Sequence, residues 1–183
     1  MRQVNEDGVS QIFSSAESIE NIKRKSDLVK KTSANIDVDL INPFLKGAIK
    51  TLEVQANTKV KPLKIHMKTG PAENIGIAGV ISLVTDTFTG SITLCFPQKV
   101  FLKIYENMFG EVHLSINKEI EDAAGELLNI IYGQAKIELN NKPGYNLKKA
   151  IPTILVGEKL NISLQGNSAT VIIPFETEFG NFH

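Results

Sequence analysis

Glu126 and Asn129 are the two residues of this 183-residue sequence whose types and spacing best suit chemistry. They are three residues apart in a segment that is expected to be helical, so their side chains should be neighbours that point the same way. An ionised glutamate only accepts hydrogen bonds and can anchor a cation, whereas an asparagine amide has a donor and an acceptor and can orient a water molecule. Together, the two groups suit the placement of a cation and a water molecule side by side.

The segment that carries this pair is predicted to be the longest helix, at about residues 118–140. Asn117 is a good N-cap, and Glu119 and Glu121 in the first turn oppose the helix dipole. Residues 142–144 (Lys-Pro-Gly) end the helical pattern. At 100° per residue, the apolar side chains gather on one broad face that should pack on a sheet: Ile120, Ala123, Ala124, Leu127, Leu128, Ile130, Ile131 and Ala135.

The opposite face of this helix is polar and holds two glycines. Gly125 and Gly133 each cost about 1 kcal/mol relative to alanine in a helix interior. We expect both on the exposed side, where a missing side chain would let another surface approach closely. The alternative is an ordinary solvated face with two tolerated glycines. The residues of the face are Asp122, Gly125, Glu126, Asn129, Gly133 and Lys136.

The other elements predict an α+β fold, with helices covering a mainly antiparallel sheet. Asn42 and Pro43 are expected to start a helix over residues 43–57, as N-cap and first helical residue. A helix followed by strands occurs twice, which suggests an internal pseudo-repeat. The remaining predictions are a hairpin of strands 76–84 and 90–96, a helix from Pro97 to Gly110, strands 146–157, 159–165 and 168–175, and a tight turn at 165–167.

The first 34 residues differ from the rest of the chain. They contain few aromatic residues and end in a basic stretch, which favours a flexible polar leader, although Ile12, Phe13, Ile19 and Ile22 could line one face of a short helix. We therefore divide the chain into a leader, residues 1–34, and one globular domain, residues 35–183.

Composition excludes several classes of function. Twenty basic residues balance twenty acidic ones, which gives no support for a nucleic-acid or membrane-surface partner. Cys95 is the single cysteine, so the chain fits a reducing compartment. No apolar run approaches the ~18 residues of a membrane helix. From both observations we expect a cytoplasmic protein. His66, His113 and His183 lack ligand spacing, so no metal site is predicted.

Four blocks of sequence resemble the CheC/CheX/FliY phosphatases of bacterial chemotaxis. The signature helix of that family carries Glu-x-x-Asn followed by a glycine, as residues 121–136 do here. The similarity extends over about residues 38–175. A second Glu-x-x-Asn, typical of CheC proteins, is missing from the first helix, where Ala56 follows Glu53 at that spacing, so a CheX-like member is the better match. The other blocks are residues 41–45, 60–62 and 150–157.

This resemblance implies a phosphatase that hydrolyses the aspartyl phosphate of a CheY-type response regulator. Asn129 would orient the water and Glu126 would hold the active-site lysine of the receiver domain. Gly125 and Gly133 would give clearance to the docked partner, Gln134 would support the Asn129 region by a hydrogen bond, and Asp122 and Lys136 would lie on the docking surface. The resemblance also implies a homodimer formed through sheet edges, Mg²⁺ on the partner and no cofactor of the chain itself.

Two other classes of function stay open at this point. Related folds serve as structural parts of the flagellar switch, so the chain could be a non-catalytic interaction or scaffold module of that switch or of a two-component pathway. A small-ligand-binding domain is the third possibility, and it would need a deep apolar pocket.

Overall fold

The computed structural model describes residues 37–70, 74–162 and 170–183, so the predicted leader and the predicted turn at 165–167 lie outside the described residues. The helices are α2 (Val38–Gln55), α3 (Gln98–Phe109) and α4 (Lys118–Leu139). The strands are β1 (Lys61–Pro62), β2 (His66–Met67), β3 (Ile75–Val84), β4 (Thr89–Phe96), β5 (Thr153–Leu160), β6 (Val171–Ile172), β7 (Phe175–Thr177) and β8 (Gly180–Phe182).

All strand pairings among these elements are antiparallel, which confirms the predicted α+β class. The largest sheet has the order β4-β3-β5, and the smaller ones are β1-β7-β8 and β2-β6. Two backbone hydrogen bonds between Cys95 and His183, of 2.6 and 3.1 Å, join the end of β4 to the chain beyond β8. β5 is therefore left as an edge of the largest sheet.

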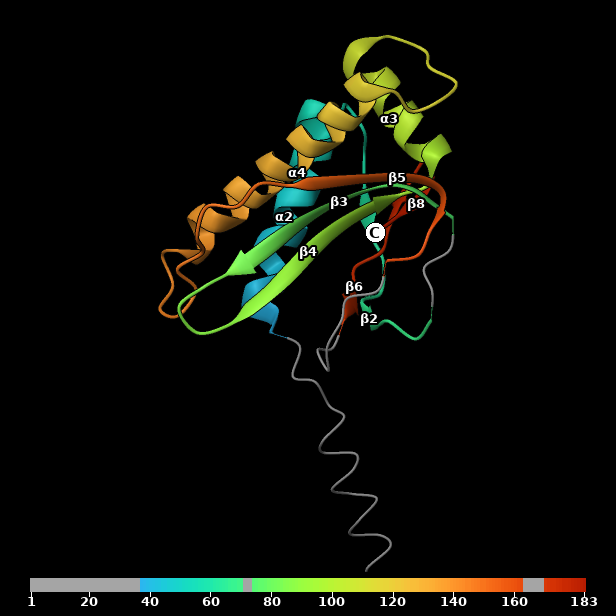
Figure 1. Ribbon diagram of the computed structural model, residues 1–183. Coiled ribbons are helices and arrows are strands. Elements are labelled where there is room, and N and C mark those ends of the chain that lie inside the picture. The colour runs from blue at the N-terminus through green and yellow to red at the C-terminus, as the bar shows by residue number, and fades with distance from the viewer. Residues whose placement is uncertain (1–36, 71–73, 163–169) are drawn as a thin grey trace, which may run out of the picture. The chain divides into compact units, whose positions relative to one another are not determined.

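Helices α2 and α4 pack against each other and cover one face of the β4-β3-β5 sheet (Figure 1). Alternate residues of β3, among them Ile77, Ile81 and Leu83, point into the core between sheet and helices. The helices contribute buried Leu52, Leu127, Leu128 and Ile131, among others. This one hydrophobic core fixes the position of α4.

The start of α4 confirms its prediction, but the start of α2 does not. The Asn117 side chain accepts a hydrogen bond from the Ile120 N–H at 3.0 Å, so Asn117 is the N-cap of α4. The cap of α2 is Asp37, which accepts from the Leu40 N–H at 3.1 Å. Pro43 lies inside α2, so the prediction that Asn42 and Pro43 begin this helix is wrong. The capping bond of Asp37 and the burial of Pro43 offset the one backbone hydrogen bond that the proline cannot donate.

The hairpin and α3 confirm their predictions as well. β3 and β4 pair in continuous register from Ile77↔Phe96 to Val84↔Thr89. α3 follows Pro97 and ends at Gly110, whose positive φ of 75° is the left-handed conformation expected of a terminal glycine.

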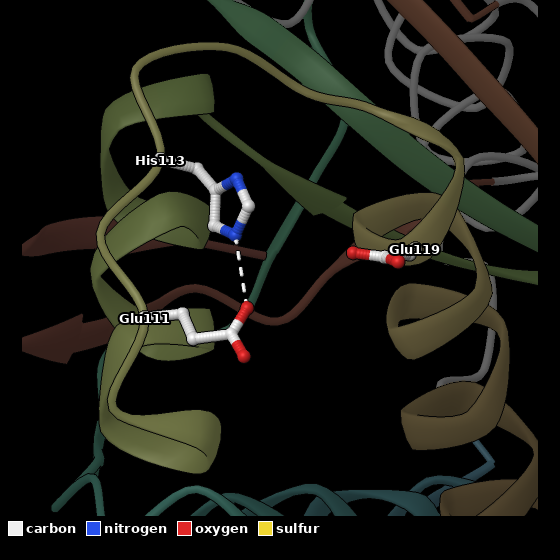
Figure 2. Close-up of side chains that lie close together, drawn as sticks. All are labelled: Glu111, His113 and Glu119. Carbon is white, nitrogen blue, oxygen red and sulfur yellow. Dashed lines mark hydrogen bonds and ion pairs between the residues drawn. The ribbon is translucent and has the colours of Figure 1, made fainter.

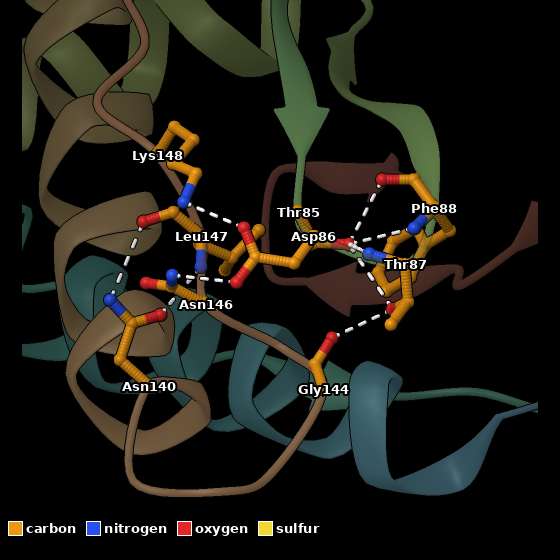
Figure 3. A network of polar contacts seen from close by, with 9 residues as sticks. All are labelled: Thr85, Asp86, Thr87, Phe88, Asn140, Gly144, Asn146, Leu147 and Lys148. Carbon is orange, nitrogen blue, oxygen red and sulfur yellow. Dashed lines mark hydrogen bonds and ion pairs between the residues drawn. The ribbon is translucent and has the colours of Figure 1, made fainter.

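The prediction for the last third of the chain is only partly right. A strand was expected over residues 146–157 and another from 159, but residues 146–152 are irregular and β5 runs from Thr153 through Leu160. Figure 3 shows that polar side chains tie residues 144–148 to the β3–β4 hairpin and to the end of α4. The Asp86 carboxylate accepts hydrogen bonds from Asn146 and Lys148, both at 2.8 Å, and the Asn140 side chain accepts from the Leu147 N–H at 2.7 Å.

Candidate active site

Helix α4 is held from beneath by a close approach to the sheet. A Cβ atom on Gly79 of β3 would lie 2.8 Å from Leu128 Cδ2, so the absence of a side chain at residue 79 makes room for Leu128 in its present rotamer. On the other flank, a Cβ on Gly47 of α2 would lie 3.2 Å from the Ile131 carbonyl oxygen. The Tyr132 hydroxyl donates a 2.6 Å hydrogen bond to the Lys148 carbonyl. These contacts fix both the position of α4 and its rotation about its own axis.

Because α4 is fixed in this way, Glu126 and Asn129 lie on its outer, exposed face. Two buried residues, Leu127 and Leu128, separate them in sequence and anchor the helix in the core. A three-residue spacing places the Cβ atoms of the pair about 5–6 Å apart. Neither side chain forms a hydrogen bond or an ion pair with another residue of the described ranges, so their polar groups face solvent.

Charged, small and apolar residues surround Glu126 and Asn129 on the outer face of α4. Asp122, one turn before Glu126, is exposed and forms a 3.0 Å ion pair with Lys118. The hydrogen bond to Asp122 and its negative charge raise the pKa of Lys118. Gly133 and Lys136 are half-buried, and nothing lies within 4 Å of a Cβ built on Gly133. Ile137, one further turn along, is 72% exposed, an apolar feature of this face that the sequence analysis did not identify.

Gly125 does not lie on the exposed side, and that expectation is wrong. It is buried, and a Cβ at this position would contact the Ile154 Cδ1 and Cγ1 atoms of β5 at 3.7 Å. Gly125 is rotated by about 100° from Glu126 around the helix, which puts it at the border of the polar face. The adjacent edge strand β5 covers this border, so Gly125 is not open to a partner.

The expected support of Asn129 by Gln134 is also absent. Gln134 is half-buried, and within the part of the chain that the structure describes it forms no hydrogen bond with Asn129. Five helical residues rotate a side chain by about 140°, so Gln134 and Asn129 point in different directions.

The comparison with known families decides what kind of protein carries this helix. The family model described as "Chemotaxis phosphatase CheX" matches residues 77–176, which include all of α4. The chain belongs to the CheX family of chemotaxis phosphatases. This confirms the resemblance that the Glu-x-x-Asn helix indicated. A comparison with curated protein sequences finds no match.

Solved structures agree with this family. A CheC-like superfamily protein from Shewanella sp. PV-4 is 32% identical, with a TM-score of 0.75 over 80% of this chain and 95% of that one. The chemotaxis protein CheX from Vibrio vulnificus is 29% identical, with a TM-score of 0.73 over 79% and 95%. The CheX–CheY–BeF₃–Mg²⁺ complex from Borrelia burgdorferi shares the fold at 23% identity, with a TM-score of 0.65 over 79% and 94%.

Within the described ranges, no helix combines the length and the apolar character that a bilayer crossing requires.

Proposed function

We propose that this CheX-family phosphatase accelerates hydrolysis of the aspartyl phosphate on a CheY-type receiver domain, with Glu126 and Asn129 as its catalytic residues. The observation that supports this most strongly is the exposure of a carboxylate and an amide, side by side on a rigid helix, neither of which has a partner among the described residues. A pair like this, held by a packed core, can enter the site of another protein without rearrangement.

In the proposed reaction, a water molecule attacks the phosphorus atom, the bond between phosphorus and the aspartate oxygen breaks, and inorganic phosphate leaves. Such a transfer needs positioning and charge stabilisation more than covalent chemistry. Asn129 would orient the water, since its amide can accept one hydrogen bond from it and donate another to a phosphoryl oxygen. Glu126 would bind the active-site lysine of the receiver and so fix the docked geometry.

Mg²⁺ belongs to the receiver in this proposal, and the reaction needs no cofactor from this chain. The Borrelia burgdorferi complex, whose CheX component shares this fold, contains both CheY and Mg²⁺. The metal would neutralise the phosphoryl charge from the receiver's side. Asn129 and Glu126 would approach from the other side.

The docking surface would be the outer face of α4, including Asp122, Gly133 and Lys136. Gly133 leaves open space at its centre, and exposed Ile137 offers apolar area at one end. Protein interfaces combine such apolar patches with a polar rim. This favours a macromolecular substrate over a small molecule.

We also propose that the protein is a cytoplasmic homodimer formed through a sheet edge, with residues 1–34 as a leader separate from the domain of residues 35–183. β5 is an edge strand of the largest sheet, no other strand of the described ranges pairs with its outer side, and its Leu155 and Val156 are exposed. An unpaired strand with apolar side chains is a ready site for pairing with a second chain. Light scattering on the purified chain would give twice the monomer mass if this is right.

The test of the proposed activity is the decay of a phosphorylated CheY-type receiver with and without this chain, in the presence of Mg²⁺. Glu126→Gln should reduce the acceleration roughly tenfold, chiefly through weaker receiver binding. Glu121→Gln is the matched control, because Glu121 lies on the same helix but pairs with Lys118. Receiver binding without any change in decay rate would instead support the non-catalytic interaction module.

A further inference from the structure

Three metal-ligating side chains converge where the α3–α4 connection meets the first turn of α4. They are Glu111, His113 and Glu119, and Figure 2 shows Glu111 and His113 approaching from the connection and Glu119 from the helix. One ligand atom of each lies within 4.8 Å of the other two. The distance between His113 Nε2 and Glu111 Oε2 is 3.3 Å.

The distance between His113 and Glu111 matches that between two ligands of a tetrahedral metal site. Zinc binds imidazole nitrogen and carboxylate oxygen at about 2.0–2.2 Å, which places neighbouring ligand atoms about 3.3 Å apart. His113 and Glu111 already have this separation. Because the Glu119 ligand atom lies within 4.8 Å of the other two, it would have to move closer by at most about 1.5 Å, which an exposed glutamate achieves by a change of rotamer.

The imidazole is held in place before any ion arrives. His113 packs edge-on against the buried Tyr105 ring, with a centroid distance of 5.3 Å and an interplanar angle of 84°. Only 24% of the His113 side chain is exposed. A ligand that is fixed by its neighbours loses little conformational entropy on binding.

The charges at this place are not balanced by protein cations. Among the described residues, no lysine or arginine forms an ion pair with Glu111 or Glu119, and His113 is the one ion-pair partner of Glu111. Burial, followed by the negative charges of Glu111 and Glu119, raises the pKa of Tyr105. Two carboxylates that share a site without a cation favour the binding of a positive ion.

We propose that Glu111, His113 and Glu119 form a binding site for a divalent first-row transition-metal ion of the Zn²⁺ class, with water completing the coordination. The imidazole favours such an ion over Mg²⁺ and Ca²⁺, which prefer all-oxygen sites. The bound ion would join the connection after α3 to the first turn of α4. It would thereby restrain the helix that carries Glu126, two turns further on.

The sequence analysis predicted no metal site, because the histidines lack the spacing of metal ligands. Its ligands come from two separate elements, so the donors assemble only when α3 and α4 take their places. The proposal does not depend on the phosphatase mechanism, because it concerns different side chains.

The test is a Zn²⁺ titration of the full, untagged chain after removal of metals, against a chromogenic chelator at pH 7.5. The native protein should bind one Zn²⁺ ion, and His113→Ala and Glu119→Gln should each weaken binding at least tenfold. Co²⁺ should give visible absorption bands in the native chain that both variants lose. Glu121→Gln, which makes the same charge change in the same helical turn, should bind Zn²⁺ as the native protein does.

A second control excludes the other histidines. His66 and His183 line a common hollow away from this cluster, so His66→Ala should leave the Zn²⁺ affinity unchanged. The proposal is overturned if the native chain binds no Zn²⁺ at 100 μM, if His113→Ala and Glu119→Gln bind like the native chain, or if His66→Ala abolishes binding. Zn²⁺ should also raise the melting temperature of the native chain but not that of the Glu119→Gln variant. Because Glu119 is exposed, this variant should fold normally.

Discussion

The two glycines of α4 provide a prediction that separates helix stability from partner docking. A Cβ on Gly133 meets nothing within 4 Å, and a Cβ on Gly125 meets Ile154 at an ordinary contact distance of 3.7 Å. Alanine therefore fits at both positions. Each substitution should raise the free energy of unfolding by about 1 kcal/mol, because glycine is disfavoured by that amount in a helix interior. For a domain of this size, that is roughly 3 °C in melting temperature.

The two positions should differ when a larger side chain meets the receiver. Gly133 lies on the proposed docking surface, whereas Gly125 is covered by β5. Gly133→Leu should therefore keep the gain in stability but raise the KM for the phosphorylated receiver at least tenfold. Gly125→Ala should leave the KM unchanged.

Urea unfolding and receiver-decay kinetics on the same preparations would decide both points. A loss of stability in Gly125→Ala would contradict the packing of α4 against Ile154. An unchanged KM in Gly133→Leu would show that the receiver does not dock on this face of the helix.

Three further predictions concern the rest of the domain. The 2.6 Å hydrogen bond from Tyr145 is the main cause that lowers the pKa of Asp37, so its stabilisation is present above pH 4 and is lost as the pH falls through the lowered pKa. Tyr145→Phe should therefore lower the free energy of unfolding by up to about 1 kcal/mol near pH 7, and acid unfolding curves should show this difference from the native protein shrinking. The same contact raises the pKa of Tyr145 to about 12, so the difference should also shrink at strongly alkaline pH. The buried Thr51 hydroxyl has no hydrogen-bond partner among the described residues, so Thr51→Val should stabilise the protein by about 1 kcal/mol in urea, and destabilisation would mean that the hydroxyl is paired in solution. Burial raises the pKa of the Cys95 thiol to about 12, so a thiol reagent at pH 8 should label Cys95 only after unfolding, and rapid labelling of the native chain would contradict its burial.

Local signals explain why α4 could be predicted from the sequence. The Asn117 side chain caps the helix by accepting a hydrogen bond from the N–H of Ile120, three residues further on. The apolar period that follows is set by residues one or two turns apart. The exposure of Glu126 and Asn129 follows from the same period. The resemblance to a known family rested on this helix together with three other blocks of sequence, and the family model confirms it.

Features that depend on distant parts of the chain could not be predicted in this way. β6, β7 and β8 are two or three residues long. β6 pairs with β2 and β7 pairs with β1, both far away in sequence, so alternation alone could not set the ends of these strands. Gly125 lies at the border of a helix face, where the cover provided by Ile154 decides its burial. Neither the polar contacts of Asp86 nor the cluster around His113 has a local sequence pattern.

The most direct test of the central claim is the decay of a phosphorylated CheY-type receiver in the presence of Asn129→Ala. Alanine stabilises an exposed helix at least as well as asparagine, so the variant should fold normally, and Glu126 would still hold the receiver. We predict that the acceleration of decay falls on the order of 10²–10³-fold, while the Kd for the receiver changes less than threefold. An Asn129→Ala protein that accelerates decay as the native chain does would contradict the assignment of Asn129 as the water-orienting residue.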